Sequence, residues 1–114
     1  MDTTALDKII VGRVNPHIYA FTTETIPNYL KVGDTYRPVE TRLNEWRKHF
    51  ANLKPQYSHV ATTDDGQFFR DYSVHFYLEM EKRKERLKKD SFPDVYFSNE
   101  FFKETSANDV AEAI

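Results

Sequence analysis

The sequence contains no cysteine and only three glycines among its 114 residues. Without cysteine, the fold has neither a disulfide framework nor a zinc site with thiolate ligands. So few glycines, together with five prolines, argue against a flexible linker or a low-complexity chain. A chain of this length corresponds to one domain with a single core. We therefore expect one folded domain over residues 1–114.

Long apolar runs and a large net charge are also missing. No run is long enough to span a bilayer, and the polar N-terminus lacks the pattern of a signal peptide. We therefore expect a cytoplasmic protein with no membrane partner. The net charge of −2 argues against a protein that coats nucleic acid through bulk electrostatic attraction. Aromatic residues are abundant at 15 %, which predicts a core built on aromatic rings.

The order of local patterns predicts a small α/β (α+β) domain. Residues 2–10 fit a short N-terminal helix. Residues 18–23 and 29–33 are rich in β-branched and aromatic residues, and the turn residues 24–28 between them predict a β-hairpin. Residues 57–62 predict a third strand. We expect a three-stranded, mainly antiparallel sheet flanked by helices.

Two helices are expected to follow the hairpin. The first opens at Arg37-Pro38, with Pro38 in its first turn, and ends by Pro55, and its apolar residues recur at helical spacing. These residues are Val39, Leu43, Trp46 and Phe50. The second is expected from Phe68 to Lys89. Its buried stripe is expected to comprise Phe69, Tyr72, Phe76 and Met80. Its basic C-terminal half, residues 82–89, is either a solvated helix end or a surface facing DNA.

The C-terminal part predicts two short elements. Residues 95–97 are a candidate edge strand. Ser106 is followed three residues later by an acid, which predicts a capping box and a final helix. That helix still presents apolar residues at Ile114 and has no visible cap. We therefore expect the chain to be the N-terminal part of a longer protein with covalently linked domains after Ile114.

Short motifs along the chain resemble, in order, those of the GIY-YIG nuclease superfamily. They are His17-Ile18-Tyr19, Tyr29-Leu30-Lys31-Val32-Gly33, Arg42 in the following helix, Asp71 to His75, and Asn99-Glu100-Phe101-Phe102. Within the superfamily, the chain is similar to the branch with a K-I-G-x-T second motif and an E-x-x-x-H helix. The resemblance extends from His17 to Phe102, which is most of the chain.

The resemblance implies hydrolysis of DNA phosphodiester bonds with one divalent metal ion, Mg²⁺ or Mn²⁺. Tyr19 would accept a proton from the attacking water, and Lys31 on the same face of the hairpin would lower the pKa of Tyr19. Arg42 would stabilise the charge that develops on the phosphate. Asp71 would bind the metal, and His75 of the same motif is a further catalytic candidate. The whole protein would then belong to a restriction-modification or helicase-linked system.

Basic residues near these motifs are the candidates for DNA contacts. They are Arg37, Arg47, Lys48, Lys82 and Lys84. For two other residues of the motifs a structural role is the alternative. His75 would then be a hydrogen-bonded core histidine. Glu100 would be a carboxylate that holds a helix start or an arginine.

Asp71 stands where the family has glutamate, and it shortens the reach of the carboxylate by one methylene, about 1.5 Å. Three explanations are open at this point: the helix lies closer to the site, Glu79 supplies the ligand instead, or the domain binds DNA or protein without cutting. A purely structural domain that docks through exposed aromatic residues is a weaker alternative. It predicts a contiguous apolar patch on the surface.

Overall fold

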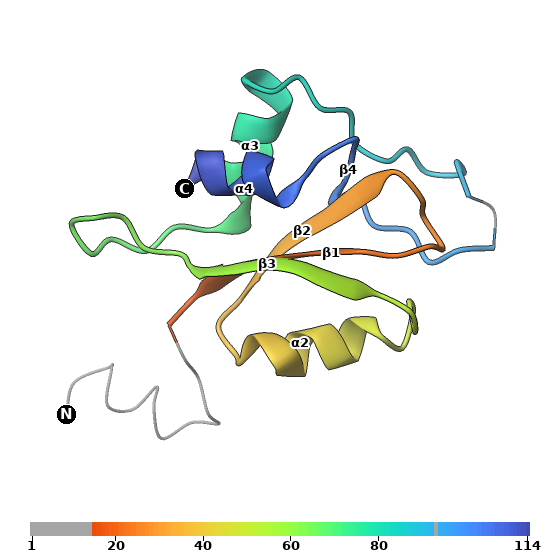
Figure 1. Cartoon of the computed structure of the whole chain (residues 1–114), viewed down its shortest axis with the longest axis horizontal. Coiled ribbons are helices and arrows are strands. Elements are labelled where there is room, and N and C mark those ends of the chain that lie inside the picture. Colours follow the sequence, from red (N-terminus) through yellow and green to blue (C-terminus); the bar gives the residue numbers. More distant parts are fainter. Residues whose placement is uncertain (1–14, 93) are drawn as a thin grey trace.

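The computed structural model describes residues 15–92 and 94–114 and has an α+β fold built on one antiparallel sheet (Figure 1). The strand order is β3-β1-β2-β4. The strands are β1 (His17–Thr22), β2 (Tyr29–Thr35), β3 (Lys54–Val60) and β4 (Phe101–Lys103). The helices in the described ranges are α2 (Val39–Trp46), α3 (Asp71–Met80) and α4 (Ala107–Ala113). The helix expected at residues 2–10 lies outside the described residues.

The expected hairpin is confirmed. Strands β1 and β2 pair antiparallel, with Tyr19 opposite Gly33 and Phe21 opposite Lys31. Asn28 ends the connecting turn with φ of 68°, a left-handed conformation in which asparagine is enriched among non-glycine residues. Strand β3 pairs with the other edge of β1. The register places the side chains of Tyr19 and Lys31 on the same face of the sheet.

Each face of the sheet has its own core, because successive side chains of a strand point to opposite sides. One face packs against α3 and α4, and its core comprises Ile18, Ala20, Leu30, Val32, Ala61, Val74, Leu78, Phe102 and Val110. The other face packs against α2, and its core comprises Tyr19, Phe21, Ile26, Leu43, Trp46, Phe50, Leu53, Leu87 and Phe101. Figure 1 shows α2 on one side of the sheet and α3 with α4 on the other.

The sheet has four strands, and the fourth differs from the one expected. Residues 95–97 form no strand, whereas β4 pairs with β2 through Lys31 and Phe101 and the two residue pairs beside them. The pairing buries Phe101 in the core beside α2 and Phe102 in the core beside α3. A strand is the conformation that sends two adjacent rings into two different cores. Tyr96 and Phe97 remain exposed.

The long helix expected from Phe68 to Lys89 is wrong in both its length and its buried face. Helix α3 covers only Asp71–Met80. The side chains of Tyr72, Phe76 and Met80 are 67 %, 65 % and 58 % exposed. The residues buried on α3 are Val74, His75 and Leu78. The His75 ring donates a hydrogen bond to the backbone carbonyl of Val32, so α3 lies close to β2, and smaller side chains fill the space between them.

The basic segment after α3 is not helical. Arg83 has φ of 55°, which is incompatible with a continuing right-handed helix. The chain then runs beside β4, where the Leu87 N–H donates to Phe101 O and the Lys103 N–H donates to Glu85 O. The helix after Pro38 is confirmed, but it is shorter than expected: Pro38 precedes α2, and α2 ends at Trp46, before Phe50. The expected capping box at the start of α4 is confirmed. No helix in the described ranges is both long and apolar enough to cross a membrane.

Candidate active site

Gly33 provides the space in which Tyr19 and Lys31 meet. Tyr19 lies opposite Gly33 on β1, and Lys31 lies two residues before Gly33 on β2, so the three positions share one face. A Cβ atom at Gly33 would lie 2.6 Å from Tyr19 Oη and 2.9 Å from Lys31 Nζ. These distances are shorter than van der Waals contact. Glycine is therefore required here for its missing side chain.

Lys31 is completely buried and forms an ion pair with Glu100, the residue before β4. Its Nζ donates a hydrogen bond to Glu100 Oε1 at 2.7 Å. Burial lowers the pKa of Lys31, and the Glu100 carboxylate partly offsets this effect. Burial also raises the pKa of Glu100, but the charge and hydrogen bond of Lys31, together with a hydrogen bond from Asp71, leave that pKa lowered. Glu100 therefore holds neither a helix start nor an arginine through its side chain.

Asp71, His75 and Glu100 form a cluster at the N-terminal end of α3. One possible ligand atom from each residue lies within 4.8 Å of the others. The Nε2 atom of His75 lies 2.8 Å from Val32 O and 3.9 Å from Asp71 Oδ2. Because a carbonyl oxygen only accepts, His75 Nε2 carries the hydrogen and has no lone pair for a metal. His75 thus matches the hydrogen-bonded core histidine, and its pKa is lowered by burial.

The two carboxyl groups of the cluster fit a divalent cation. Burial, followed by repulsion from Asp34 and Glu100, raises the pKa of Asp71 to about 7. Asp71 keeps its proton near neutral pH because it is partly buried and a second carboxylate lies beside it. A divalent cation bound between the two groups would replace that proton. Carboxylate oxygens are ligands that Mg²⁺ accepts. Asp71 and Glu100 are therefore the residues that would hold such an ion.

Two features of the surroundings bear on the short side chain of Asp71. The Asp34 carboxylate accepts hydrogen bonds from the Asp71 N–H at 2.9 Å and from Arg70 Nε at 2.6 Å. These bonds tie the first turn of α3 to β2, so a short carboxylate reaches Glu100. Glu79, the alternative ligand, is instead paired with Arg86 at 2.8 Å and is not part of the cluster.

Arg42 faces the same site from α2. Its Nη1 donates to Glu45 Oε1 at 2.8 Å, and Arg37 binds both oxygens of that carboxylate. The hydrogen bonds from Arg37 and Arg42 lower the pKa of Glu45 to about 2. The guanidinium carbon of Arg42 lies 5.1 Å from the centroid of the Trp46 ring. Glu45 thereby holds Arg42 beside the buried part of the site.

Tyr19 is buried, and its Oη accepts a hydrogen bond from Trp46 Nε1 at 2.7 Å. Burial raises the pKa of Tyr19 to about 12, while the charge of Arg42 and the hydrogen bond of Trp46 act in the opposite direction. The expected lowering of this pKa by Lys31 is therefore wrong. The Lys31 ammonium is bound to Glu100, and the cation that acts on Tyr19 is Arg42.

The basic residues expected to contact DNA lie on two sides of the sheet and do not form one surface. Three of them flank α2: Arg37, Arg47 and Lys48. Arg47 is paired with Glu40. Lys82 and Lys84 lie near Asp109 of α4, and Lys82 also pairs with Glu112. Because α4 covers the face opposite α2, these two lysines are remote from the first group (Figure 1).

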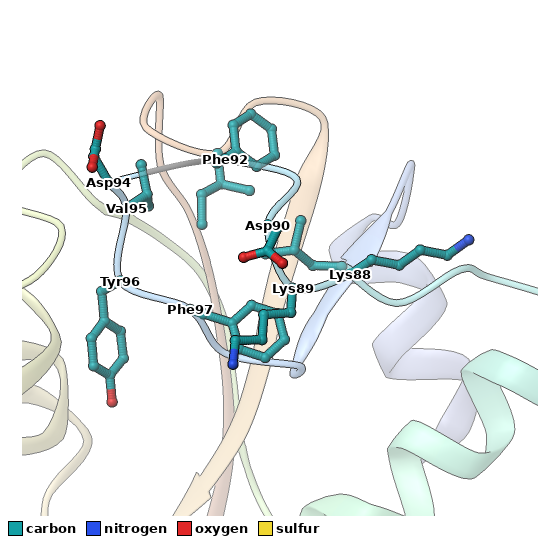
Figure 2. A pocket seen from close by; sticks show the side chains of 10 residues that line it. Lys88, Lys89, Asp90, Phe92, Asp94, Val95, Tyr96 and Phe97 are labelled. Carbon is teal, nitrogen blue, oxygen red and sulfur yellow. The ribbon is translucent and has the colours of Figure 1, made fainter.

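A cavity of about 170 Å³ lies in the loop before β4 (Figure 2). It is lined by Ile26, Leu87, Lys88, Lys89, Asp90, Phe92, Asp94, Val95, Tyr96 and Phe97. None of the candidate catalytic residues lines it. Tyr96 connects this cavity with the candidate active site. The centroid of its ring lies 3.7 Å from the centroid of the His49 ring, on which it stacks, and 5.9 Å from that of Trp46.

Two residues of the site were not predicted as functional from the sequence: Glu100 and Trp46. Glu100 belongs to a motif of the resemblance, which was the signal available for it. Trp46 was predicted only as a core residue of the helical stripe. Comparison of the chain with protein-family models, with curated proteins and with solved structures finds no match. The function therefore has to be inferred from the site residues and their geometry.

Proposed function

We propose that the chain is a metal-dependent nuclease domain of the GIY-YIG type that hydrolyses phosphodiester bonds of DNA. The observation that carries the proposal is a chain of contacts between parts of the sequence: Tyr19 and Lys31 meet at Gly33, the charge of Arg42 acts on Tyr19, and Lys31 pairs with Glu100 of the carboxylate pair. Phosphodiester hydrolysis needs a proton acceptor, a cation for the phosphate oxygens and a metal site. These residues supply all three.

A Mg²⁺ or Mn²⁺ ion held by Asp71 and Glu100 would supply Lewis-acid polarisation of the phosphate. Arg42 is one third exposed, and its guanidinium can exchange Glu45 for two phosphate oxygens. Tyr19 accepts the proton of the attacking water, and its high pKa predicts a rate that rises with pH. Lys31 is completely buried, so it orients Glu100 and does not contact DNA.

A module that binds DNA without cutting it is the second candidate function. The raised pKa of Tyr19 favours it, because a phenol with a pKa of about 12 is almost entirely protonated at neutral pH. The protein partners of Lys31 and Arg42 also favour it, since both cations are already neutralised by carboxylates. This module would retain the fold and the basic residues flanking α2.

Cleavage of supercoiled plasmid tests the proposal. The wild-type protein should nick DNA with Mn²⁺ or Mg²⁺ and should lose this activity in EDTA. Tyr19→Phe and Arg42→Ala should each lower the rate roughly 10²- to 10⁴-fold, since each removes a group that acts on the transition state. Lys54→Ala is the control, because Lys54 is an exposed cation on β3 and is not among the candidate catalytic or DNA-contact residues.

Two outcomes decide between the candidate functions. Metal-dependent nicking that survives Tyr19→Phe and Arg42→Ala unchanged would contradict the nuclease proposal. Absence of nicking, together with DNA binding that Arg42→Ala weakens in a fluorescence anisotropy titration, would favour the non-cutting module.

A further inference from the structure

Trp46 contacts three groups of the proposed site at once. Its Nε1 donates to Tyr19 Oη at 2.7 Å. The centroid of its ring lies 4.4 Å from Lys31 Nζ and 5.1 Å from the guanidinium carbon of Arg42. Trp46 is the last residue of α2 and is almost completely buried. It is also the single tryptophan of the chain.

The direction of the hydrogen bond follows from the chemistry of indole. The indole N–H only donates, so the phenol oxygen of Tyr19 accepts, and the Tyr19 hydroxyl proton points elsewhere. A hydrogen bond to a phenolate is stronger than one to a neutral phenol. Trp46 therefore favours the proton-accepting form of Tyr19 without adding a charge to the site.

The indole ring also lies beside two cations that repel each other. An aromatic face attracts ammonium and guanidinium groups, and the attraction is larger where water is excluded. Lys31 and Arg42 are both within the distance at which this attraction acts. The ring thus helps to hold two like charges near Tyr19.

Neighbouring rings fix the orientation of the indole. The Trp46 ring is stacked on Phe50 at a centroid distance of 6.1 Å, and it contacts Phe21 and Tyr96, each at 5.9 Å. A ring packed in this way cannot turn its N–H away from Tyr19 without displacing several neighbours. The hydrogen bond is therefore formed before any substrate binds.

We infer that Trp46 is a positioning residue that orients the phenol oxygen of Tyr19 for proton transfer. Its effect on the reaction rate rests on the proposed nuclease function. The hydrogen bond does not, and it is measurable in the absence of DNA and metal.

Nuclear magnetic resonance tests the hydrogen bond directly. A single tryptophan gives one indole N–H signal in a ¹⁵N–¹H correlation spectrum. Tyr19→Phe removes the acceptor and should move this signal to a lower proton chemical shift. Tyr57→Phe is the matched control, since Tyr57 lies on β3 and packs beside the core of the α3 face. An indole signal that stays in place in Tyr19→Phe would overturn the inference.

The nuclease assay tests the effect on the reaction. Trp46→Phe keeps an aromatic ring and removes the N–H. It should lower kcat roughly 10- to 100-fold, with little change in KM, since a hydrogen bond to a charged group is lost. The pH profile of kcat should also shift to higher pH, because the pKa of Tyr19 loses a lowering contribution.

Val110→Ala is the control for a general loss of stability, because Val110 lies on α4 and is buried in the core of the other sheet face. Val110→Ala should lower stability and leave the pH profile in place. Equal pH profiles of Trp46→Phe and wild type would overturn the inference. If the indole N–H signal moves in Tyr19→Phe but the wild-type protein does not cut DNA, the proposed function fails and the hydrogen bond stands. If the signal stays in place and the wild-type protein does cut DNA, the proposed function stands and the role of Trp46 fails.

Discussion

The two faces of the sheet differ in where they place aromatic and charged residues. On the α2 face, Phe21, Trp46 and Phe50 pack together, and Tyr19 and Lys31 are buried among them. On the face covered by α3 and α4, the buried side chains are mainly aliphatic. The aromatic residues Tyr72 and Phe76 of α3 point outward. Aromatic faces and an indole N–H stabilise buried cations and polar oxygens, whereas an aliphatic core cannot.

The carboxylate cluster joins the two faces at the outer edge of β2. Strand β4 pairs with β2 only as far as Lys31. Beyond that point, α3 lies beside β2: the His75 ring donates to Val32 O, and the Asp71 N–H donates to the Asp34 carboxylate. Asp71 can therefore approach Glu100 and Lys31 even though its helix covers the opposite face. The site requires both layers.

Gly33→Ala should have the largest effect, because it fills the space shared by Tyr19 and Lys31. We expect a loss of about 2–3 kcal/mol in the free energy of unfolding and complete loss of nicking. Urea denaturation measures the first effect. Gly66→Ala is the matched control: Gly66 has φ of 85°, but a Cβ there would contact nothing within 4 Å. It should cost only about 1 kcal/mol, from backbone strain. Equal losses in the two variants would contradict the packing around Gly33.

Asp71→Asn should change the dependence of stability on pH. The pKa of Asp71 rises from 3.8 to about 7 on folding, so the folded state binds the proton more tightly than the unfolded state. Stability should therefore fall as pH rises from about 4 to about 7. Asp71→Asn removes this loss and should gain about 1–2 kcal/mol at pH 8 and nothing below pH 4, allowing for solvent screening. Thermal denaturation across pH measures the difference.

Asp109→Asn on α4 is a control for which we expect the opposite dependence of stability on pH. Partial burial raises the pKa of Asp109, but hydrogen bonds from Ser106 and the charge of Lys84 leave it lowered. Its contribution to stability should be present above pH 4 and should be lost as pH falls through the lowered pKa. If both variants showed the same pH dependence, the raised pKa of Asp71 would be refuted.

Phe76→Gln should have the smallest effect, because the Phe76 ring is mostly exposed on α3. We expect a change within about 0.5 kcal/mol in the free energy of unfolding. Tyr72→Gln, one turn earlier on the same face, should behave alike. A loss above about 1 kcal/mol in the free energy of unfolding of either variant would show that the rings of Tyr72 and Phe76 pack against the protein in solution. The contrast between the two sheet faces would then fail.

Elements set by neighbouring residues could be predicted from the sequence. The hairpin depends on strand formers around a turn, α2 on Pro38 and an apolar stripe, and α4 on the capping box at Ser106. The buried face of α3 could not be predicted in this way. Its aromatic residues have helical spacing, but the hydrogen bond from His75 to Val32, 43 residues away, turns another face toward the sheet.

The site shows the same limit. Tyr19, Lys31, Arg42 and Asp71 were predicted because the motifs of a resembling family contain them. Glu100 and Trp46 acquire their roles from partners 69 and 27 residues away in the sequence. Strand β4 is similar, since three residues are too few to show a strand pattern and they are ordered by pairing with β2. Long-range contacts decide these features.

Strand β2 accepts two hydrogen bonds from the helix that supplies Asp71. Within three consecutive residues it provides the carbonyl of Val32 for His75, the open space at Gly33 and the Asp34 carboxylate for the start of α3. Any local opening that frees α3 therefore also separates the carboxylate pair. Amide hydrogens of α3 and of the β2 edge should consequently exchange with solvent as one cooperative unit. Assembly of the site and docking of the helix are the same event.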